Sequence, residues 1–226
     1  MQSKALKRTL YILGSIVLCI IIFVLYLYNI IPHKAYTASD FNIETILAQH
    51  DGNGNGIDDL DDILQGAKHE IEHMPTYKSA YYEGGYPPAS EGVCTDVIWR
   101  ALRYAGYDVK EMIDEDITKN ISAYPRVNGE PDPNIDFRRV PNVAKYLERH
   151  TQRLSTALED PSEWQRGDII VFSDSHIGIL SDQRNRNGFP FLLHNGNLPV
   201  GEEDCLAREA FLKGISGHYR FIVKEK

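Results

Sequence analysis

The longest uninterrupted apolar stretch of the chain covers residues 9–31 and contains no charged residue. About 20 helical residues cross a bilayer core, so this stretch predicts a transmembrane helix. It is longer than the apolar core of a cleaved signal peptide, and Lys4, Lys7 and Arg8 precede it. Because basic residues stay on the cytoplasmic side, we expect a cytoplasmic tail at 1–8, a single-pass anchor in the lipid bilayer at 9–31, and an extracytoplasmic remainder.

A linker at 32–39 is followed by a region in which apolar residues recur with helical spacing. One buried helical stripe consists of Ile98, Ala101, Leu102 and Ala105. The same spacing predicts further helices at 41–50, 60–71, 109–117 and 143–147. A proline-containing loop is expected at 122–135.

The pattern changes to β-branched and aromatic runs in the last third of the chain. Three consecutive strands are predicted within 163–173, 174–182 and 191–196, because polar, glycine-containing turns bound them. A closing strand is expected at 217–223. The second and third strands each carry a histidine, His176 and His194.

Composition limits the class of protein. The chain has 226 residues, of which 42% are hydrophobic and 25% are charged, as in an ordinary globular domain. Its formal net charge is −8, and it lacks a run of lysine or arginine that would form a phosphate-binding face. We therefore expect one folded domain and no nucleic-acid partner.

Cys94 lies where a glycine-rich loop becomes the first turn of the predicted helix. The unpaired N–H groups and positive dipole at a helix start favour an anion, so a thiol there ionises more easily. Cysteine is also frequent as a small buried residue, and this stretch alone favours the two interpretations about equally. A thiol on a helix start with histidines on later strands is nevertheless the arrangement that nucleophilic thiol catalysis requires.

Three parts of the chain, in this order, resemble the tyrosine, Gly-Gly and cysteine helix, the Pro-Gly-Asp strand and the two histidine strands of NlpC-type cell-wall peptidases. These enzymes form a papain-like superfamily. The matching segments are 81–97, 164–172, 176–179 and 192–194. The resemblance extends over roughly 60–226 and is closest to an uncharacterised bacterial branch of that superfamily.

The resemblance implies an α+β, papain-like NlpC-type fold, in which N-terminal helices pack on an antiparallel sheet. It also implies hydrolysis of amide bonds, in particular those of cell-wall peptide stems, without an organic cofactor. Cys94 would attack the carbonyl, His176 would take and return the proton, and His194 would orient His176. Asn195 and Asp182 are alternatives for the third role, and the resemblance selects His194.

Three further residues are candidates for substrate binding. Tyr81 matches the family's tyrosine. Arg138 and Arg139 lie outside the predicted helices, where they could hold a substrate carboxylate by bidentate pairing. Such arginines more often tie down a loop, and we favour that alternative slightly.

A glycine-rich acidic segment follows the helix predicted at 41–50. Its expected ligands resemble those of an EF-hand calcium loop and are Asp51, Asn53, Asn55, Ile57, Asp59 and Asp62. With flanking helices it predicts a helix-loop-helix at 40–73 that holds a structural Ca²⁺. The alternative is a solvated acidic turn.

Two other functions remain open on the sequence. The segment His69-Glu70-Ile71-Glu72-His73 is a literal H-E-x-x-H, which could bind zinc with Glu70 as general base. The domain could also be an inert, calcium-dependent cell-surface binding module. A disulfide between Cys94 and Cys205 would quench the thiol, and we do not expect one.

Overall fold

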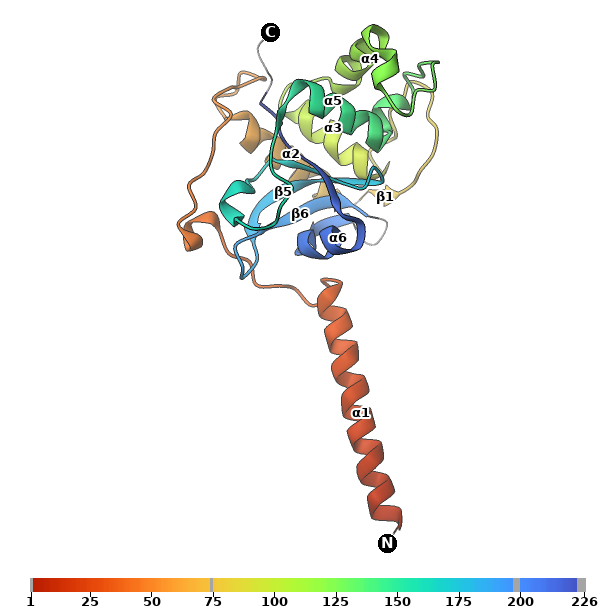
Figure 1. Ribbon diagram of the computed structural model, residues 1–226, viewed down its shortest axis with the longest axis vertical. Coiled ribbons are helices and arrows are strands. Elements are labelled where there is room, and N and C mark those ends of the chain that lie inside the picture. Colours follow the sequence, from red (N-terminus) through yellow and green to blue (C-terminus); the bar gives the residue numbers. More distant parts are fainter. Residues whose placement is uncertain (1, 74, 197–199, 223–226) are drawn as a thin grey trace. The chain divides into compact units, whose positions relative to one another are not determined.

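The computed structural model describes residues 2–73, 75–196 and 200–222. The chain forms two compact units, Met1–Lys34 and Ala35–Lys226. Figure 1 shows the N-terminal helix of the first unit and the mixed helices and strands of the second.

The first unit consists mainly of helix α1 (Gln2–Leu27). Its segment Leu6–Leu27 is long and apolar enough to cross a membrane, and a membrane span and a signal sequence both fit it. The predicted span continued to residue 31, but the helix ends at Leu27. Asn29, which follows, has a φ of 55°, a left-handed conformation that asparagine tolerates and that stops a helix.

The second unit combines helices with a sheet and belongs to the α+β class. Its helices are α2 (Asp59–Glu72), α3 (Cys94–Tyr104), α4 (Val109–Lys119), α5 (Val140–His150) and α6 (Leu206–Lys213), with 3-10 turns η1 (Ala38–Phe41), η2 (Ile121–Ala123), η3 (Asp136–Arg138) and η4 (Pro161–Glu163). Its strands are β1 (Thr76–Tyr77), β2 (Glu91–Gly92), β3 (Gln152–Arg153), β4 (Ile169–Phe172), β5 (His176–Arg184), β6 (Pro190–Asn195), β7 (Val200–Glu203) and β8 (Ile215–Arg220).

The main sheet has the strand order β3-β8-β4-β5-β6-β7, and every neighbouring pair is antiparallel. The C-terminal strand β8 lies inside the sheet, between β3 and β4. A separate parallel pair joins β1 to β2, just before the cysteine helix. The antiparallel sheet agrees with the expectation from the sequence.

The sheet has two buried faces, because successive side chains of a strand point to opposite sides. The side that we call the α3 face carries Ile177, Ile179 and Leu193, which pack with helices α2, α3, α4 and α5. The opposite side, the α6 face, carries Phe172, Leu180 and Leu192, which pack with Trp164, Cys205 and Leu206. Figure 1 shows α2, α3 and α5 on one side of the sheet and α6 on the other.

Helix α3 is held against α2 by a close crossing. A Cβ at Gly66 would lie 2.6 Å from the Cβ of Tyr104 and 2.8 Å from the Cα of Ala101, distances that real Cβ atoms do not adopt. Only glycine permits this approach. The crossing fixes the helix that begins at Cys94.

Most predicted helices and strands are confirmed, and one helix is wrong. Residues 42–50 form no helix. Instead, Ala48 and Gln49 donate backbone N–H bonds to Asp58, and Ile46 donates to the side chain of Gln165. These bonds satisfy backbone N–H groups in an irregular, non-helical path, which overrides a weak helical preference.

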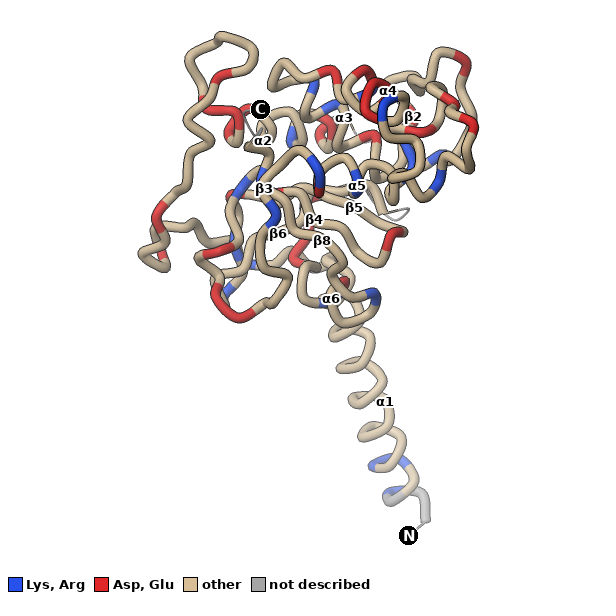
Figure 2. Tube along the Cα trace, turned by 45° about the horizontal axis from the view of Figure 1, so that its top comes forward, with Lys and Arg blue, Asp and Glu red and all other residues tan. Residues whose placement is uncertain are grey.

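The end of the chain differs in detail from the prediction. Strand β8 covers Ile215–Arg220, and residue 223, the last of the predicted closing strand, lies outside the described residues. Strand β7 and helix α6 were not predicted. Acidic and basic positions are interspersed over the second unit (Figure 2).

Candidate active site

Cys94 is the first residue of α3, as the apolar spacing predicted, and it is 6% exposed. Asp96 holds this helix start, because its carboxylate accepts the backbone N–H of Val93 and the indole N–H of Trp99, both at 2.7 Å. The guanidinium of Arg138 makes two further bonds of 2.8 Å to the same carboxylate. A buried bidentate pair of this kind has a well-defined geometry, so the first turn around Cys94 is rigidly supported.

The Cys94 thiol ionises less easily than the sequence predicted. Burial raises the pKa of the Cys94 thiol to about 11, although the backbone amides of Ile177 and Thr95 act in the opposite direction. Desolvation disfavours the charged thiolate more strongly than the amides at the helix start favour it. Cys94 is therefore a neutral thiol at pH 7 in this structure.

His176 and His194 lie side by side, which is the contact that the sequence predicted for them. Nε2 of His176, the first residue of β5, lies 2.7 Å from Nδ1 of His194 on β6. Burial first, and then His194 and Lys213, lower the pKa of His176 to about 3. His176 is thus uncharged at pH 7, the protonation state that a general base needs.

The rings of His176 and His194 lie on the α6 face, where His176 stacks on Phe172, whereas Cys94 lies on the α3 face. The backbone N–H of Ile177, the residue after His176, interacts with the Cys94 sulfur. Within the part of the chain that the structure describes, no hydrogen bond joins this sulfur to either histidine ring. The structure therefore brings the two histidines together but does not bring either ring to the Cys94 thiol.

The two alternatives for the third residue lie elsewhere. Asn195 points to the side opposite His194, where its Nδ2 donates to the carbonyl of Gly92 at 3.2 Å. Its Oδ1 is buried and has no partner among the described residues. Asp182 is bonded to Lys68, far along β5 from the histidine pair.

The predicted substrate-binding residues are engaged within the protein. Arg138 pairs with Asp96, and Arg139 with Asp136 at 2.9 Å. This geometry corresponds to the alternative in which the arginines tie down a loop. The side chain of Tyr81 is exposed, and its hydroxyl donates to Asp132.

The H-E-x-x-H segment has a structural explanation. Glu70 is buried and forms an ion pair with Arg100 of α3, so its carboxylate is not available as a base. Nδ1 of His73 bonds the carbonyl of His69 at 2.7 Å. Among the described residues, these side chains are not part of a cluster of three potential ligands.

The acidic loop is organised by hydrogen bonds of its own. Asp51 accepts backbone N–H groups of residues 54–56, and Asp62 accepts the side-chain amides of Asn53 and Asn55. Asp59 accepts the backbone N–H of Gly52. Calcium would need the two amide oxygens to turn toward Asp62. The predicted ligand Ile57 contributes only its backbone carbonyl to such a set.

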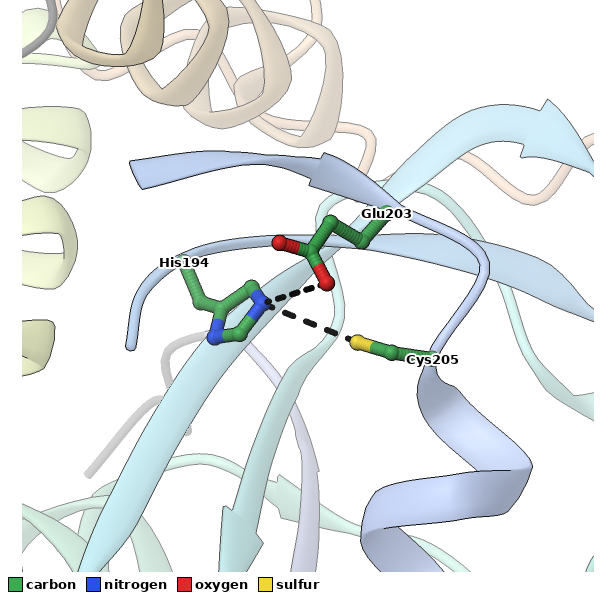
Figure 3. Close-up of side chains that lie close together, drawn as sticks. All are labelled: His194, Glu203 and Cys205. Atoms are coloured by element: carbon green, nitrogen blue, oxygen red, sulfur yellow. Dashed lines mark hydrogen bonds and ion pairs between the residues drawn. The ribbon is translucent and has the colours of Figure 1, made fainter. Parts of the chain in front are cut away.

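A second cluster, which sequence reasoning missed, surrounds His194 on the α6 face. Nε2 of His194, the ring nitrogen that does not face His176, lies 3.6 Å from Sγ of Cys205 and 3.9 Å from Oε2 of Glu203 (Figure 3). Cys94 and Cys205 are both free thiols and belong to the cores of opposite faces. The sequence contained Cys205 as a candidate for a disulfide only, and nothing in it indicated that Glu203 pairs with β6.

The fold and the site thus define an α+β domain with a helix-starting cysteine and a histidine pair. Residues 64–221 match the model of the family described as "Domain of unknown function (DUF1287)", and the chain belongs to this family. It is similar to "Uncharacterized protein YijF" of Escherichia coli (strain K12), with 39% identity over 172 residues, 72% of this chain and 82% of that protein. No solved structure matches.

Proposed function

We propose that this protein is a thiol hydrolase that cleaves amide bonds, with peptides of the bacterial cell wall as the substrate class. In this proposal α1 is an uncleaved anchor and the domain works on the extracytoplasmic side of the membrane. The substrate class and the location rest on the resemblance to NlpC-type peptidases and on the sequence of residues 1–31. The chemistry rests on the geometry around Cys94.

One observation carries the proposal. The backbone N–H of Ile177 lies against the Cys94 sulfur, and the preceding residue is His176, whose Nε2 is hydrogen-bonded to His194. With Nε2 donating its proton to His194, the lone pair on Nδ1 of His176 remains to accept a proton. Nδ1 has no hydrogen-bond partner within the described residues.

The reaction then proceeds from neutral groups. The proposed reaction requires the His176 ring, which lies on the α6 face, to turn toward Cys94. As Sγ of Cys94 then attacks the carbonyl carbon, its proton moves to Nδ1 of His176, and the backbone N–H at the start of α3 stabilises the developing oxyanion. The imidazolium returns that proton to the leaving amine, and water then hydrolyses the thioester. Because the thiol pKa is high and the imidazole pKa is low, proton transfer has to accompany the attack.

Labelling with a peptide that carries a thiol-directed electrophile tests the proposal. Mass spectrometry should locate the label on Cys94, and labelling should disappear in Cys94→Ser and His176→Ala. Purified cell wall should release peptide fragments only with the unaltered protein. A folded protein that neither takes the label nor digests cell wall would favour the inert binding module instead.

A further inference from the structure

The α6 face contains a group of potential metal ligands that does not include the proposed nucleophile, Cys94. The group consists of His194, Glu203 and Cys205, and one ligand atom from each lies within 4.8 Å of the others. All three residues are buried. Figure 3 shows the carboxylate and the thiol converging on the same ring nitrogen of His194.

The two ligand separations measured from His194 are close to those around a tetrahedral zinc ion. Zinc bonds of about 2.3 Å to sulfur and about 2.0–2.2 Å to nitrogen or oxygen, at tetrahedral angles, set ligand atoms about 3.4–3.6 Å apart. The observed separations from His194 Nε2 are 3.6 Å to the sulfur and 3.9 Å to the carboxylate oxygen. Contraction by less than half an ångström would bring the carboxylate into range.

The three ligands come from two paired strands and from the start of the helix that follows them. His194 is on β6, and the antiparallel register with β7 sets Glu203 opposite Leu192, on the same face of the sheet. Cys205 follows two residues later, at the N-terminal end of α6. The ligands therefore come from rigid elements, which hold their geometry better than loops do.

The charge and burial of the ligand atoms also suit a cation. Cys205 and Glu203 are both buried, so little water competes for these ligand atoms. A divalent ion would displace the thiol proton and balance the thiolate and carboxylate charges. Arg208 contacts the same oxygen of Glu203 at 3.3 Å, so the ion has to share this carboxylate with a guanidinium.

His176 would be an outer partner, a residue that hydrogen-bonds a metal ligand without contacting the metal itself. A metal-bound histidine usually donates its other ring N–H to an acceptor, which fixes the tautomer and the ring orientation. Nδ1 of His194 is 2.7 Å from Nε2 of His176, which provides that acceptor. We infer that His194, Glu203 and Cys205 bind zinc with a fourth position left to water, and that His176 orients the histidine ligand.

Binding of cobalt, a spectroscopic substitute for zinc, tests the site in the full-length protein in detergent micelles. One equivalent per chain should bind and produce a thiolate-to-cobalt charge-transfer band in the near ultraviolet. Zinc should abolish this band by displacing the cobalt. The band should disappear in Cys205→Ser and persist in the matched control Cys94→Ser.

Two further variants distinguish the loss of the zinc site from a loss of folding. Glu203→Gln keeps the shape of the side chain and should lower zinc affinity, while His176→Gln should lower it about 10–100-fold as an outer partner. Zinc should raise the melting temperature of the unaltered protein and of Cys94→Ser. Substoichiometric binding by the unaltered protein, or a band that persists in Cys205→Ser, overturns the inference.

Zinc at His194 would also affect the proposed reaction, a consequence that rests on the proposed function. With zinc on Nε2, His194 carries its proton on Nδ1 and donates it to Nε2 of His176, so the proton of His176 moves to Nδ1, its base position. Zinc should then suppress labelling of Cys94 by the peptide electrophile, and a chelator should restore it. Undiminished labelling of zinc-loaded protein overturns this consequence, whereas absent labelling without zinc contradicts only the proposed function.

Discussion

Cys94 and Cys205 are both buried next to the start of a helix, but the central sheet separates them. On the α3 face, backbone amides and apolar side chains surround the Cys94 sulfur. On the α6 face, the Cys205 sulfur has a histidine nitrogen and a carboxylate close by. Backbone N–H groups around a sulfur suit a nucleophile that acts on a bound substrate. Side-chain nitrogen and oxygen atoms around a sulfur suit a metal ion.

Both rings of the histidine pair lie on the α6 face. Each ring of the pair has one nitrogen bonded to the other ring. The remaining nitrogen of His194 is directed at Cys205, and His176 precedes the residue whose amide contacts Cys94. The comparison therefore teaches that Cys94 and the histidine pair lie on opposite faces of the sheet and are joined by the backbone of β5 at His176 and Ile177.

Loss of the α3-face nucleophile or of its base should have the largest effect. Cys94→Ala and His176→Ala should each reduce amide hydrolysis by about 10³-fold or more, because nucleophile and base act as a unit. His194→Ala should leave a small measurable remainder and Asn195→Ala most of the activity. Release of peptides from purified cell wall measures these rates, with Cys19→Ala as the control. Near-normal turnover in His194→Ala, together with a collapse in Asn195→Ala, would show that the wrong side of β6 had been assigned to the site.

The second effect concerns the reactivity of the two thiols without substrate. A pKa of about 11 for Cys94 implies roughly 300-fold less thiolate at neutral pH than an ordinary cysteine with a pKa of about 8.5. A small neutral alkylating reagent should therefore modify Cys94 at least about 100-fold more slowly in folded than in unfolded protein, and Cys205 more slowly still. Mass spectrometry of timed samples gives both rates. Fast modification of Cys94 at pH 7 would indicate a preformed thiolate.

A smaller effect should appear in the alkaline stability of the protein. The folded-state pKa of Cys94 is raised from 9.0 to about 11, so the folded protein retains the thiol proton longer than the unfolded chain does. This contribution is fully present below about pH 9 and is lost between pH 9 and 11, by as much as about 3 kcal/mol. Urea unfolding of Cys94→Ala should show less alkaline loss than the unaltered protein. Equal pH profiles would contradict the buried, neutral thiol.

The smallest effect is that of calcium on the loop before α2. A weak site, with a dissociation constant of about 10⁻⁴–10⁻³ M, should stabilise the protein by about 1–3 kcal/mol at 10 mM calcium, or a few degrees in melting temperature. Asp51→Ala should abolish the calcium-dependent part of the melting temperature. The predicted calcium loop precedes α2 and the proposed zinc ligands lie on the α6 face, so the two shifts should be additive. A melting temperature unaffected by calcium would leave only an acidic turn.

Strong local patterns were sufficient to predict the elements on the α3 face. The stripe from Ile98 to Ala105 placed Cys94 at a helix start, and β-branched runs identified β4, β5 and β6. The pattern failed at 42–50 because the side chain of Gln165, more than a hundred residues away, bonds the backbone of Ile46. No local spacing reports such a contact.

The α6 face was less predictable for the same reason. Strand β7 has the short sequence Val200-Gly201-Glu202-Glu203, which lacks apolar alternation and forms a strand because it pairs with β6. Glu203 becomes a potential ligand only through that register. The pKa of Cys94 was also out of reach, since the helix start was visible in the sequence but the depth of burial was not.

The position of β8 has a consequence for the order in which the chain can fold. Residues 215–220 are close to the C-terminus, yet they fill an internal place between β3 and β4. During synthesis the sheet cannot be completed until β8 has left the ribosome, because among the described strands β3 pairs with β8 alone. A premature stop before Ile215 would remove an interior strand of the sheet and would not merely shorten an edge.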